Sequence, residues 1–170
     1  MISAVIAGEA VAGIPGTPIK QAFQPTLQGA NTQPTAYLHK IGDRRVGSPR
    51  RSDVWDQENG VMLHTELQKY ETTFQMSALA TQDPKTPTQY TASDILNLIA
   101  SILQSSTTIA AFEAQGVGIL RVAEVRNPYF LDDRMQNEAS PSLDFTLTHD
   151  QVVASAVPVI AEKVYQILTV

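Results

Sequence analysis

The pattern of hydrophobic and polar positions predicts one unusually long strand, from Val61 to Ala80. In its first half Leu63 and Leu67 alternate with polar residues, and this period of two is typical of a strand with one solvated face. Beyond Lys69 the hydrophobic positions change parity, so we predict a bulge or a change of environment there. A typical strand has about five or six residues. We therefore expect this one to extend beyond its own domain or to serve a second surface.

Other stretches predict shorter strands. Ser142–Thr148 alternates most clearly, with Leu143, Phe145 and Leu147 expected to face the core. Further strands are predicted at Ile19–Gln24, Thr35–Ile41, Val117–Arg126 and Ile160–Val170.

A hydrophobic stripe at helical spacing predicts one clear helix. Thr91 and Asp94 precede it with the spacing of a capping box. A second, short helix is predicted before Gly116, capped by Thr107 or Thr108. The first helix covers Ser93–Gln104, and its stripe consists of Ile95, Leu96, Leu98, Ile99, Ile102 and Leu103.

The remaining segments predict loops, apart from a short N-terminal helix over Ile2–Val11. Gly42–Asn59 is polar and lacks any periodicity, and such long loops inside small domains are generally functional or mobile. Pro25–Pro34 and Thr81–Gln89 contain turn-forming residues, and Tyr129–Pro141 is acidic. Strands with an inserted helical pair predict an α+β fold, a twisted and mostly antiparallel sheet with helices packed on one face. Residues 1–170 are expected to form a single domain.

Composition narrows the classes of function. The 170 residues include no cysteine, which excludes disulfides, thiolate nucleophiles and Cys-ligated zinc. The net charge of −5 is uneven, with +4 over residues 1–51 (six basic, two acidic) and −9 over residues 52–170 (six basic, fifteen acidic). This argues against a dedicated duplex-DNA binder but permits a surface past which DNA slides. No apolar run reaches the roughly eighteen residues of a membrane helix, and Glu9 interrupts the N-terminal one. We expect a soluble, unexported chain.

No residue constellation indicates catalysis. His39, His64 and His149 lack metal-binding spacing and are expected on sheet faces. Asp132 and Asp133 could form an acid/base pair, but adjacent carboxylates in a polar loop are more often solvated. Phosphate-loop and nucleophile motifs are missing from the sequence. We predict no catalytic, metal or cofactor site.

An arginine cluster is the most distinctive charged feature. One hypothesis is a docking loop whose guanidinium groups bind carboxylates or phosphates of a partner, with the only tryptophan as an anchor. The alternative is a solvated loop in which the arginines pair with Asp43, Asp53 and Asp56. The docking residues would be Arg44, Arg45, Arg50, Arg51 and Trp55.

Three sequence features occur in order around this cluster, namely AFQ at Ala22–Gln24, the strand TAYLHKI and the tail GDRRVG. In these features the chain resembles the neck or tail terminator proteins of contractile-tailed bacteriophages. It departs at Pro25, where the family has asparagine, and in a shortened N-terminal helix. Over residues 19–168 the order of elements continues through Leu67–Met76, Ser93–Gln104, Ile119–Val125 and the EKV of Glu162–Val164.

The resemblance implies a structural virion protein of the neck, assembled in the host cytoplasm. Such a protein forms a homo-oligomeric ring, with a hexamer expected, that terminates the tail tube and sheath. It joins them to the head connector or portal, and the genomic DNA passes through its lumen without sequence-specific binding. It implies no enzyme activity, no cofactor and no membrane partner.

Two alternatives remain open at this point. The chain could be another tail or collar subunit, or a small-molecule-binding or hydrolytic α+β domain that uses the Tyr129–Pro141 loop. The ring hypothesis also predicts a subunit interface on the long strand, because an unpaired edge invites another chain. Its residues would be Tyr70, Phe74 and Met76, with the polar side chains of His64, Glu66 and Gln68 toward solvent or the lumen.

Overall fold

The computed structural model describes residues 17–21, 34–80, 90–131, 137–139 and 141–157. The predicted N-terminal helix, the predicted strand Ile160–Val170, the pair Asp132 and Asp133, and the predicted loop Thr81–Gln89 lie outside the described residues, as does nearly all of Pro25–Pro34.

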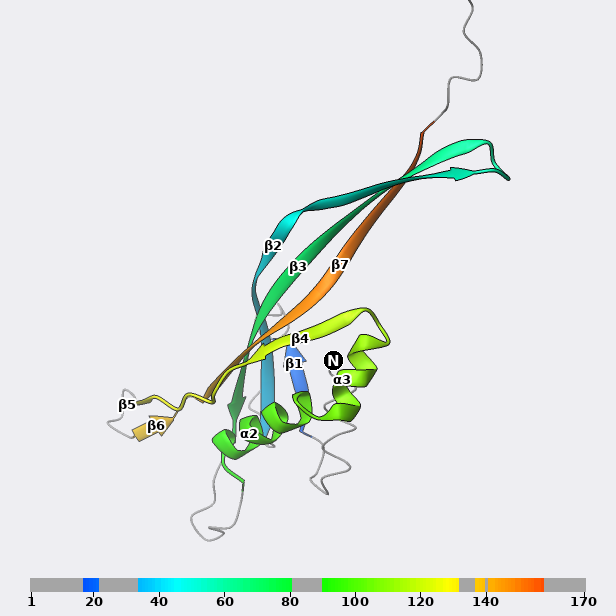
Figure 1. Cartoon of the computed structure of the whole chain (residues 1–170). Coiled ribbons are helices and arrows are strands. Elements are labelled where there is room, and N and C mark those ends of the chain that lie inside the picture. Colours follow the sequence, from blue (N-terminus) through cyan, green and yellow to red (C-terminus); the bar gives the residue numbers. More distant parts are fainter. Residues whose placement is uncertain (1–16, 22–33, 81–89, 132–136, 140, 158–170) are drawn as a thin grey trace, which may run out of the picture. The chain divides into compact units, whose positions relative to one another are not determined.

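The main sheet has five strands in the order β1-β2-β3-β7-β4, with β1 parallel to β2 and β4 antiparallel to β7. Among the described residues, two helices and a separate two-stranded sheet complete the α+β fold (Figure 1). The predicted fold class is therefore confirmed. The elements are β1 (Ile19–Gln21), β2 (Thr35–Asp56), β3 (Val61–Leu79), α2 (Ala92–Leu103), α3 (Ser106–Glu113), β4 (Val117–Val122), β5 (Tyr129–Leu131), β6 (Asn137–Ala139) and β7 (Ser142–Val157).

Side-chain contacts establish the direction of the central pair, β3 and β7. The hydroxyl oxygens of Thr73 and Thr146 lie 3.3 Å apart. Gln75 Nε2 donates to Asp144 Oδ1 at 3.0 Å. Residue numbers rise along β3 while those of the partners fall along β7, so the two strands are antiparallel.

The chain divides into two compact units. We call residues 1–44 and 70–149 the core unit, and residues 45–69 and 150–170 the hairpin unit. Strands β2, β3 and β7 each contribute residues to both. The division of β3 falls between Lys69 and Tyr70, where the sequence changes parity. The change of environment predicted there is confirmed.

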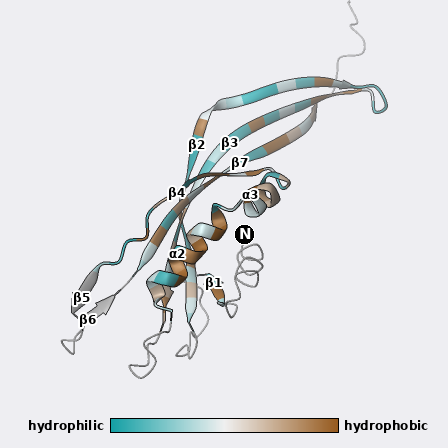
Figure 2. Cartoon of the chain, turned by 60° about the horizontal axis from the view of Figure 1, so that its bottom comes forward, coloured by the Kyte–Doolittle hydropathy of each residue, from teal (hydrophilic) through white to brown (hydrophobic). Residues whose placement is uncertain are grey.

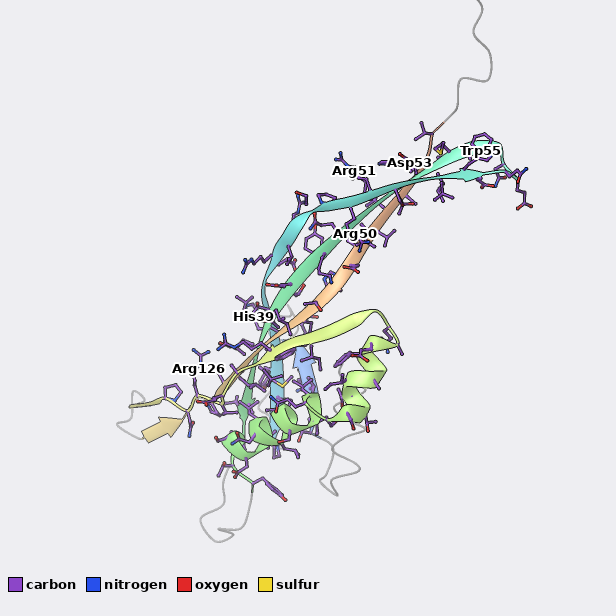
Figure 3. The ribbon with its side chains drawn as sticks, in the orientation of Figure 1. His39, Arg50, Arg51, Asp53, Trp55 and Arg126 are labelled. Carbon is purple, nitrogen blue, oxygen red and sulfur yellow. The ribbon has the colours of Figure 1, made fainter. Side chains whose placement is uncertain are left out.

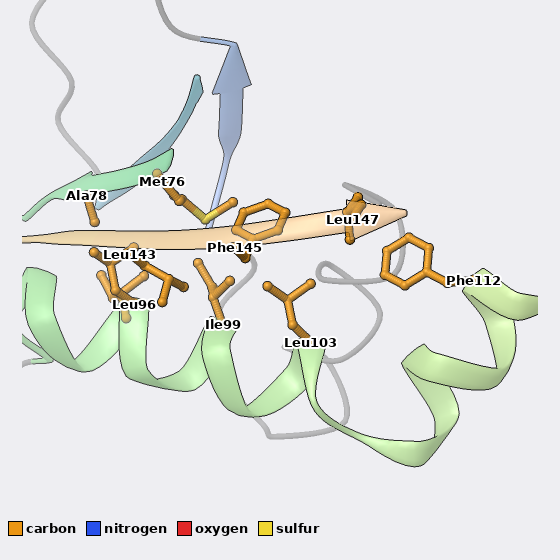
Figure 4. Close-up of a cluster of buried hydrophobic side chains, with 11 residues drawn as sticks. Met76, Ala78, Leu96, Ile99, Leu103, Phe112, Leu143, Phe145 and Leu147 are labelled. Atoms are coloured by element: carbon orange, nitrogen blue, oxygen red, sulfur yellow. The ribbon is translucent and has the colours of Figure 1, made fainter. Parts of the chain in front are cut away.

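The hydrophobic core lies between α2 and the sheet (Figure 4). Along β7 the buried residues alternate as predicted, because Leu143, Phe145 and Leu147 all face the core. Of the predicted helical stripe, Leu98 is only partly buried and does not belong to the core cluster. The buried stripe residues are Ile95, Leu96, Ile99, Ile102 and Leu103.

The helix ends are set by local hydrogen bonds. The predicted capping box is confirmed: Asp94 N donates to Thr91 Oγ1 at 3.1 Å, and Thr91 N donates to Asp94 Oδ2 at 2.9 Å. The predicted cap of α3 is wrong, because Ser105 holds that position and accepts from the backbone N–H of Thr108. Gly116, with φ of 72°, lies just beyond the helix as expected.

The predicted loop Gly42–Asn59 is wrong, since β2 continues through it as far as Asp56. A strand that is solvated on both faces has no hydrophobic alternation, so its sequence looks like a loop. Among the described residues, β2 is an edge strand beyond its pairing with β1. Edge strands tolerate proline, here Pro49. Gly47, with φ of 67°, gives the left-handed conformation typical of a bulge.

Three further boundaries differ from the prediction. Tyr129–Pro141 contains the antiparallel strands β5 and β6. Strand β4 ends at Val122, and only an isolated bridge to Ser142 involves Arg126. Strand β7 continues well past Thr148, to Val157. Within the described residues no single helix could cross a membrane; α2 and α3 meet the length and composition criteria only as a pair bent by 58°.

Candidate functional site

The hairpin unit contains no buried residue among those that the structure describes. Its strands are the β2 and β3 segments 45–56 and 61–69, joined by a turn, and the β7 segment 150–157. Hydrophobic positions are interspersed with hydrophilic ones along these strands (Figure 2). Exposed hydrophobic side chains gathered in this way are typical of an interaction surface. The large ones are Val54, Trp55, Leu63, Val152, Val153 and Val157.

The arginine cluster lies on strand β2 and not on a loop. Arg51 Nε donates to Glu66 Oε1 at 2.9 Å, and Arg44 lies 3.9 Å from the Glu71 carboxylate. Both acidic partners come from β3. Within the described residues no ion pair involves Arg50. The cluster therefore has exposed positive charge that its neighbours on β3 only partly compensate.

The three nearby aspartates contact other groups, which argues against the alternative in which they pair locally with the arginines. Asp43 accepts from Lys40 Nζ at 2.6 Å and from Thr72 Oγ1 at 2.7 Å, and these bonds lower the pKa of Asp43. Asp56 accepts from the backbone of the turn, and its pKa is lowered chiefly by the Asn59 side chain. The remaining aspartate, Asp53, contacts a histidine.

That histidine, His64, links charges on β2 and β3. Its Nδ1 lies 2.6 Å from Asp53 Oδ1, and its Nε2 lies 3.5 Å from Glu66 Oε1. The Asp53 carboxylate and, second, the Glu66 carboxylate raise the pKa of His64 above its ordinary value of 6.5. Because Glu66 also binds Arg51, four side chains form one continuous charged cluster on the hairpin. Gln68 is also on this strand and donates to the backbone oxygen of Val46 at 3.1 Å.

Alternation along β2 places Arg51, Asp53 and Trp55 on one face, and Arg50 on the other. Figure 3 labels these four side chains on the strand. Trp55 is 50% exposed, unusual for the largest apolar side chain of the molecule. A half-exposed tryptophan next to charged groups has the composition of a protein-binding surface. The docking hypothesis for Arg44, Arg45, Arg50, Arg51 and Trp55 stays a prediction.

The three residues predicted for a subunit interface belong to the core unit. Met76 is fully buried in the subunit's own core, so its side chain cannot contact a second subunit while the core is intact. This part of the hypothesis is corrected. Phe74 is partly buried and stacks on Phe145, with ring centroids 5.4 Å apart. Tyr70 stacks on His149 at 5.7 Å.

The described histidines lie on strands, as expected. His149 Nε2 is 3.1 Å from Thr72 Oγ1, which donates to Asp43, so a chain of polar contacts crosses β2, β3 and β7. Within the described residues no group of three or more potential ligands could hold a metal ion. These contacts join the three strands.

Sequence reasoning missed the far end of β7, from Gln151 to Val157. Its run of seven uncharged residues, QVVASAV, was a usable signal, because three valines in such a segment favour a strand. The segment does not alternate cleanly, which concealed it. The contact between Asp53 and His64 was also missed, because it depends on the pairing of two strands.

Comparisons with known proteins give a family for the chain and a structure of similar fold. The family described as E217 gateway protein gp29 matches residues 1–159. The fold is similar to a cryo-EM structure of an extracellular contractile injection system, the PVC sheath/tube terminator in its extended state. That similarity has a TM-score of 0.55 at 11% sequence identity, and it covers 99% of this chain and 63% of the other. This chain thus spans less than two thirds of the terminator's length. No curated protein sequence matches the chain.

Proposed function

The chain belongs to the E217 gateway protein gp29 family, and from this premise we propose that it forms a ring in the phage neck that terminates the tail. Membership makes it a structural protein of the bacteriophage tail or neck. The fold it shares with a sheath/tube terminator supports a position at the end of the tail tube and sheath. The proposed ring is a homo-oligomer, with a hexamer expected.

The observation that carries the ring is the uncovered hairpin unit. Among the described residues both faces of this small sheet are exposed, so little besides its backbone ladder and a few surface ion pairs holds it. Exposed hydrophobic faces attract other chains, and in a closed ring of identical subunits head-to-tail contacts cover such faces. The six large exposed hydrophobic side chains of the hairpin unit would then be covered by neighbouring subunits. We place the subunit and partner contacts on the hairpin unit and no longer at the buried Met76.

The proposed partners are the tail tube and sheath on one side of the ring, and head connector or portal-side proteins on the other. Genomic DNA would pass through the lumen. A net charge of −5 suits passage without adhesion, because tight DNA binding needs concentrated positive charge. The arginines of β2 would meet carboxylates of a protein partner. In this proposal the protein is assembled in the host cytoplasm, acts in the virion and catalyses no reaction.

The proposal is tested in the phage that encodes this chain, with its own copy of the gene inactivated and variants supplied from a plasmid. The wild-type chain should restore infectious particles, and micrographs should show it as a ring at the tail end. Alanine at Arg44, Arg45, Arg50 and Arg51 together should leave the far-UV circular dichroism unchanged and abolish head–tail joining. The matched control is Arg121→Ala, which removes an exposed arginine from β4 of the core unit.

Two results would contradict the proposal. Mass spectrometry of purified virions could find no copy of the chain, in which case it is not a structural component. The quadruple alanine variant could give infectious particles at wild-type yield, in which case the arginines of β2 do not dock a partner.

A further inference from the structure

The outer edge of β7 changes its surroundings at His149. Strand β4 pairs with β7 only as far as the partners Val117 and His149. From Asp150 to Val157 the strand has β3 on one side, and no described strand lies on the other. Both side-chain faces of this segment are also exposed. Eight residues of strand therefore offer an open edge within the described part of the chain.

The open edge of β7 lacks the features that normally prevent strand pairing. Edge strands are usually protected by charges, proline or bulges. The β2 edge of the same unit has charges at Arg50 and Arg51, proline at position 49, and the left-handed Gly47, a conformation typical of bulges. By contrast, Gln151–Val157 contains no charged residue and no proline. The unit is thus protected along β2 and unprotected along β7.

Backbone hydrogen bonds show which residues of β7 face the open edge. On the β4 side of the strand, Ser142 exchanges both backbone bonds with Arg126, and Asp144 O accepts from Ala123 N at 2.8 Å. Successive residues of a strand turn their backbone groups to opposite sides. The backbone N–H and C=O groups of even-numbered residues therefore point toward the β4 side of the strand. Continued along β7, this alternation directs the N–H and C=O groups of Val152, Ala154 and Ala156 to the open edge.

We propose that the β7 edge from Gln151 to Val157 accepts an extended, largely uncharged strand from a different polypeptide of the tail. Strand addition of this kind gains affinity from main-chain hydrogen bonds, and alternate side chains give specificity. The flanking valine, alanine and serine side chains favour a partner strand with small or β-branched residues and disfavour a charged one. This inference rests on the proposed function, because that function places the chain next to the tail proteins that could provide the strand.

A second copy of this chain is a poorer donor on two grounds. Its β2 edge would place Arg50, Arg51 and Asp53 beside uncharged valine and alanine residues. Pairing of β7 with β7 would be two-fold and would close at a dimer, whereas a ring of identical subunits needs head-to-tail contacts. The strand therefore comes from another protein.

The test uses proline at positions of opposite parity. Ala154→Pro removes an N–H that points to the open edge and leaves the ladder with β3 intact. Ala154→Ser keeps that N–H and is the matched control. Val153→Pro removes an N–H that points to β3 and should destabilise the hairpin unit itself, which checks the assigned parity. All three are supplied to the phage whose own copy is inactivated.

We expect Ala154→Pro to fold like the wild type by circular dichroism and to lower the yield of infectious particles roughly tenfold or more, as expected for the loss of a buried interfacial hydrogen bond. Ala154→Ser should give the wild-type yield. In hydrogen-exchange mass spectrometry the peptide covering Gln151–Val157 should exchange rapidly in the free subunit. In purified virions the same peptide should be protected.

Several outcomes would overturn the inference. These are a wild-type yield for Ala154→Pro, equal exchange of the β7 peptide in subunit and virion, or a concentration-dependent dimer of the free wild-type chain that Ala154→Pro abolishes. Should Ala154→Pro fail to fold, the exchange comparison on the wild-type chain decides alone. If virions contain the chain in a ring but the edge stays unprotected, only this inference fails. Virions without the chain would refute the proposed function.

Discussion

The same three strands behave differently in the core unit and in the hairpin unit. In the core unit one face of the sheet is covered by α2 and its side chains fill a cluster that includes the fully buried Leu96 and Phe145. In the hairpin unit β2, β3 and β7 continue as regular strands with no described residue buried. Regular strand geometry therefore does not require a hydrophobic core, whereas the folding stability of the chain does. The contrast predicts that substitutions in the core unit act on folding, and those in the hairpin unit act on assembly.

The largest effect is expected from Leu96→Ala in the core unit. Leu96 is fully buried between α2 and the sheet, so truncation should leave a cavity and lower the free energy of unfolding by about 2–5 kcal/mol. Urea denaturation followed by circular dichroism measures the change. Leu120→Ala, at an exposed position of β4, is the control and should have little effect. Equal losses from the two variants would mean that the assigned core is wrong.

A smaller loss is expected from Thr91→Ala at the start of α2. Removing the capping hydroxyl should cost about 1 kcal/mol, because Asp94 N loses its acceptor. Thr91 also lowers the pKa of Asp94 through its side chain and its backbone N–H. That contribution to stability is present above the ordinary value of 3.8 and is lost as pH falls through the lowered pKa. Acid titration of the wild type should show this loss, and the variant should show less of it.

In the hairpin unit Trp55→Ala should change the free energy of unfolding of the isolated subunit by only about 0.5 kcal/mol or less. Half of the side chain is already in solvent. Its removal should instead weaken assembly, by about 2 kcal/mol or more if it is an anchor. The control is Tyr90→Ala, an exposed aromatic residue of the core unit. Particle yield separates the two variants, and a similar yield for both would show that Trp55 is no anchor.

The smallest effect is expected from the protonation of His64. Its pKa is raised in the folded chain, so its contribution to stability is fully present below the ordinary value of 6.5 and is lost as pH rises through the raised pKa. Amide exchange in the hairpin unit should therefore accelerate more steeply with pH than base catalysis alone requires. His64→Gln should remove that extra dependence. An NMR titration of the His64 imidazole that gives a pKa at or below 6.5 would contradict the raised pKa.

How far the sequence predicts the structure depends on what a residue contacts. Three features were predicted correctly, because each reflects local geometry or burial on one face. They are the capping box at Thr91, the helical stripe of α2 apart from Leu98, and the alternation of Leu143, Phe145 and Leu147. The parity change near Lys69 was also informative, since it marks the division between the units.

The errors have a common physical origin. Residues 45–56 pair as a strand with both faces in solvent, so no periodicity records the pairing. The four clustered arginines were identified by type, but their placement on a strand and their contacts with β3 depend on strand register, which a single sequence does not reveal. Met76 was assigned to a surface because strand alternation does not distinguish a core from an interface. The sequence drew attention to the arginines and Trp55 but not to the edge of β7.

One further consequence concerns mechanical load. Because β2, β3 and β7 each contribute residues to both units, tension applied to the hairpin unit would pass along three covalent backbones to the core unit. Pulling along antiparallel strands loads their hydrogen bonds in shear, so many must fail together, whereas peeling breaks them one at a time. Forced unfolding is governed by the height of that barrier and not by equilibrium stability. A part of the molecule that contributes little to folding could thus still bear force.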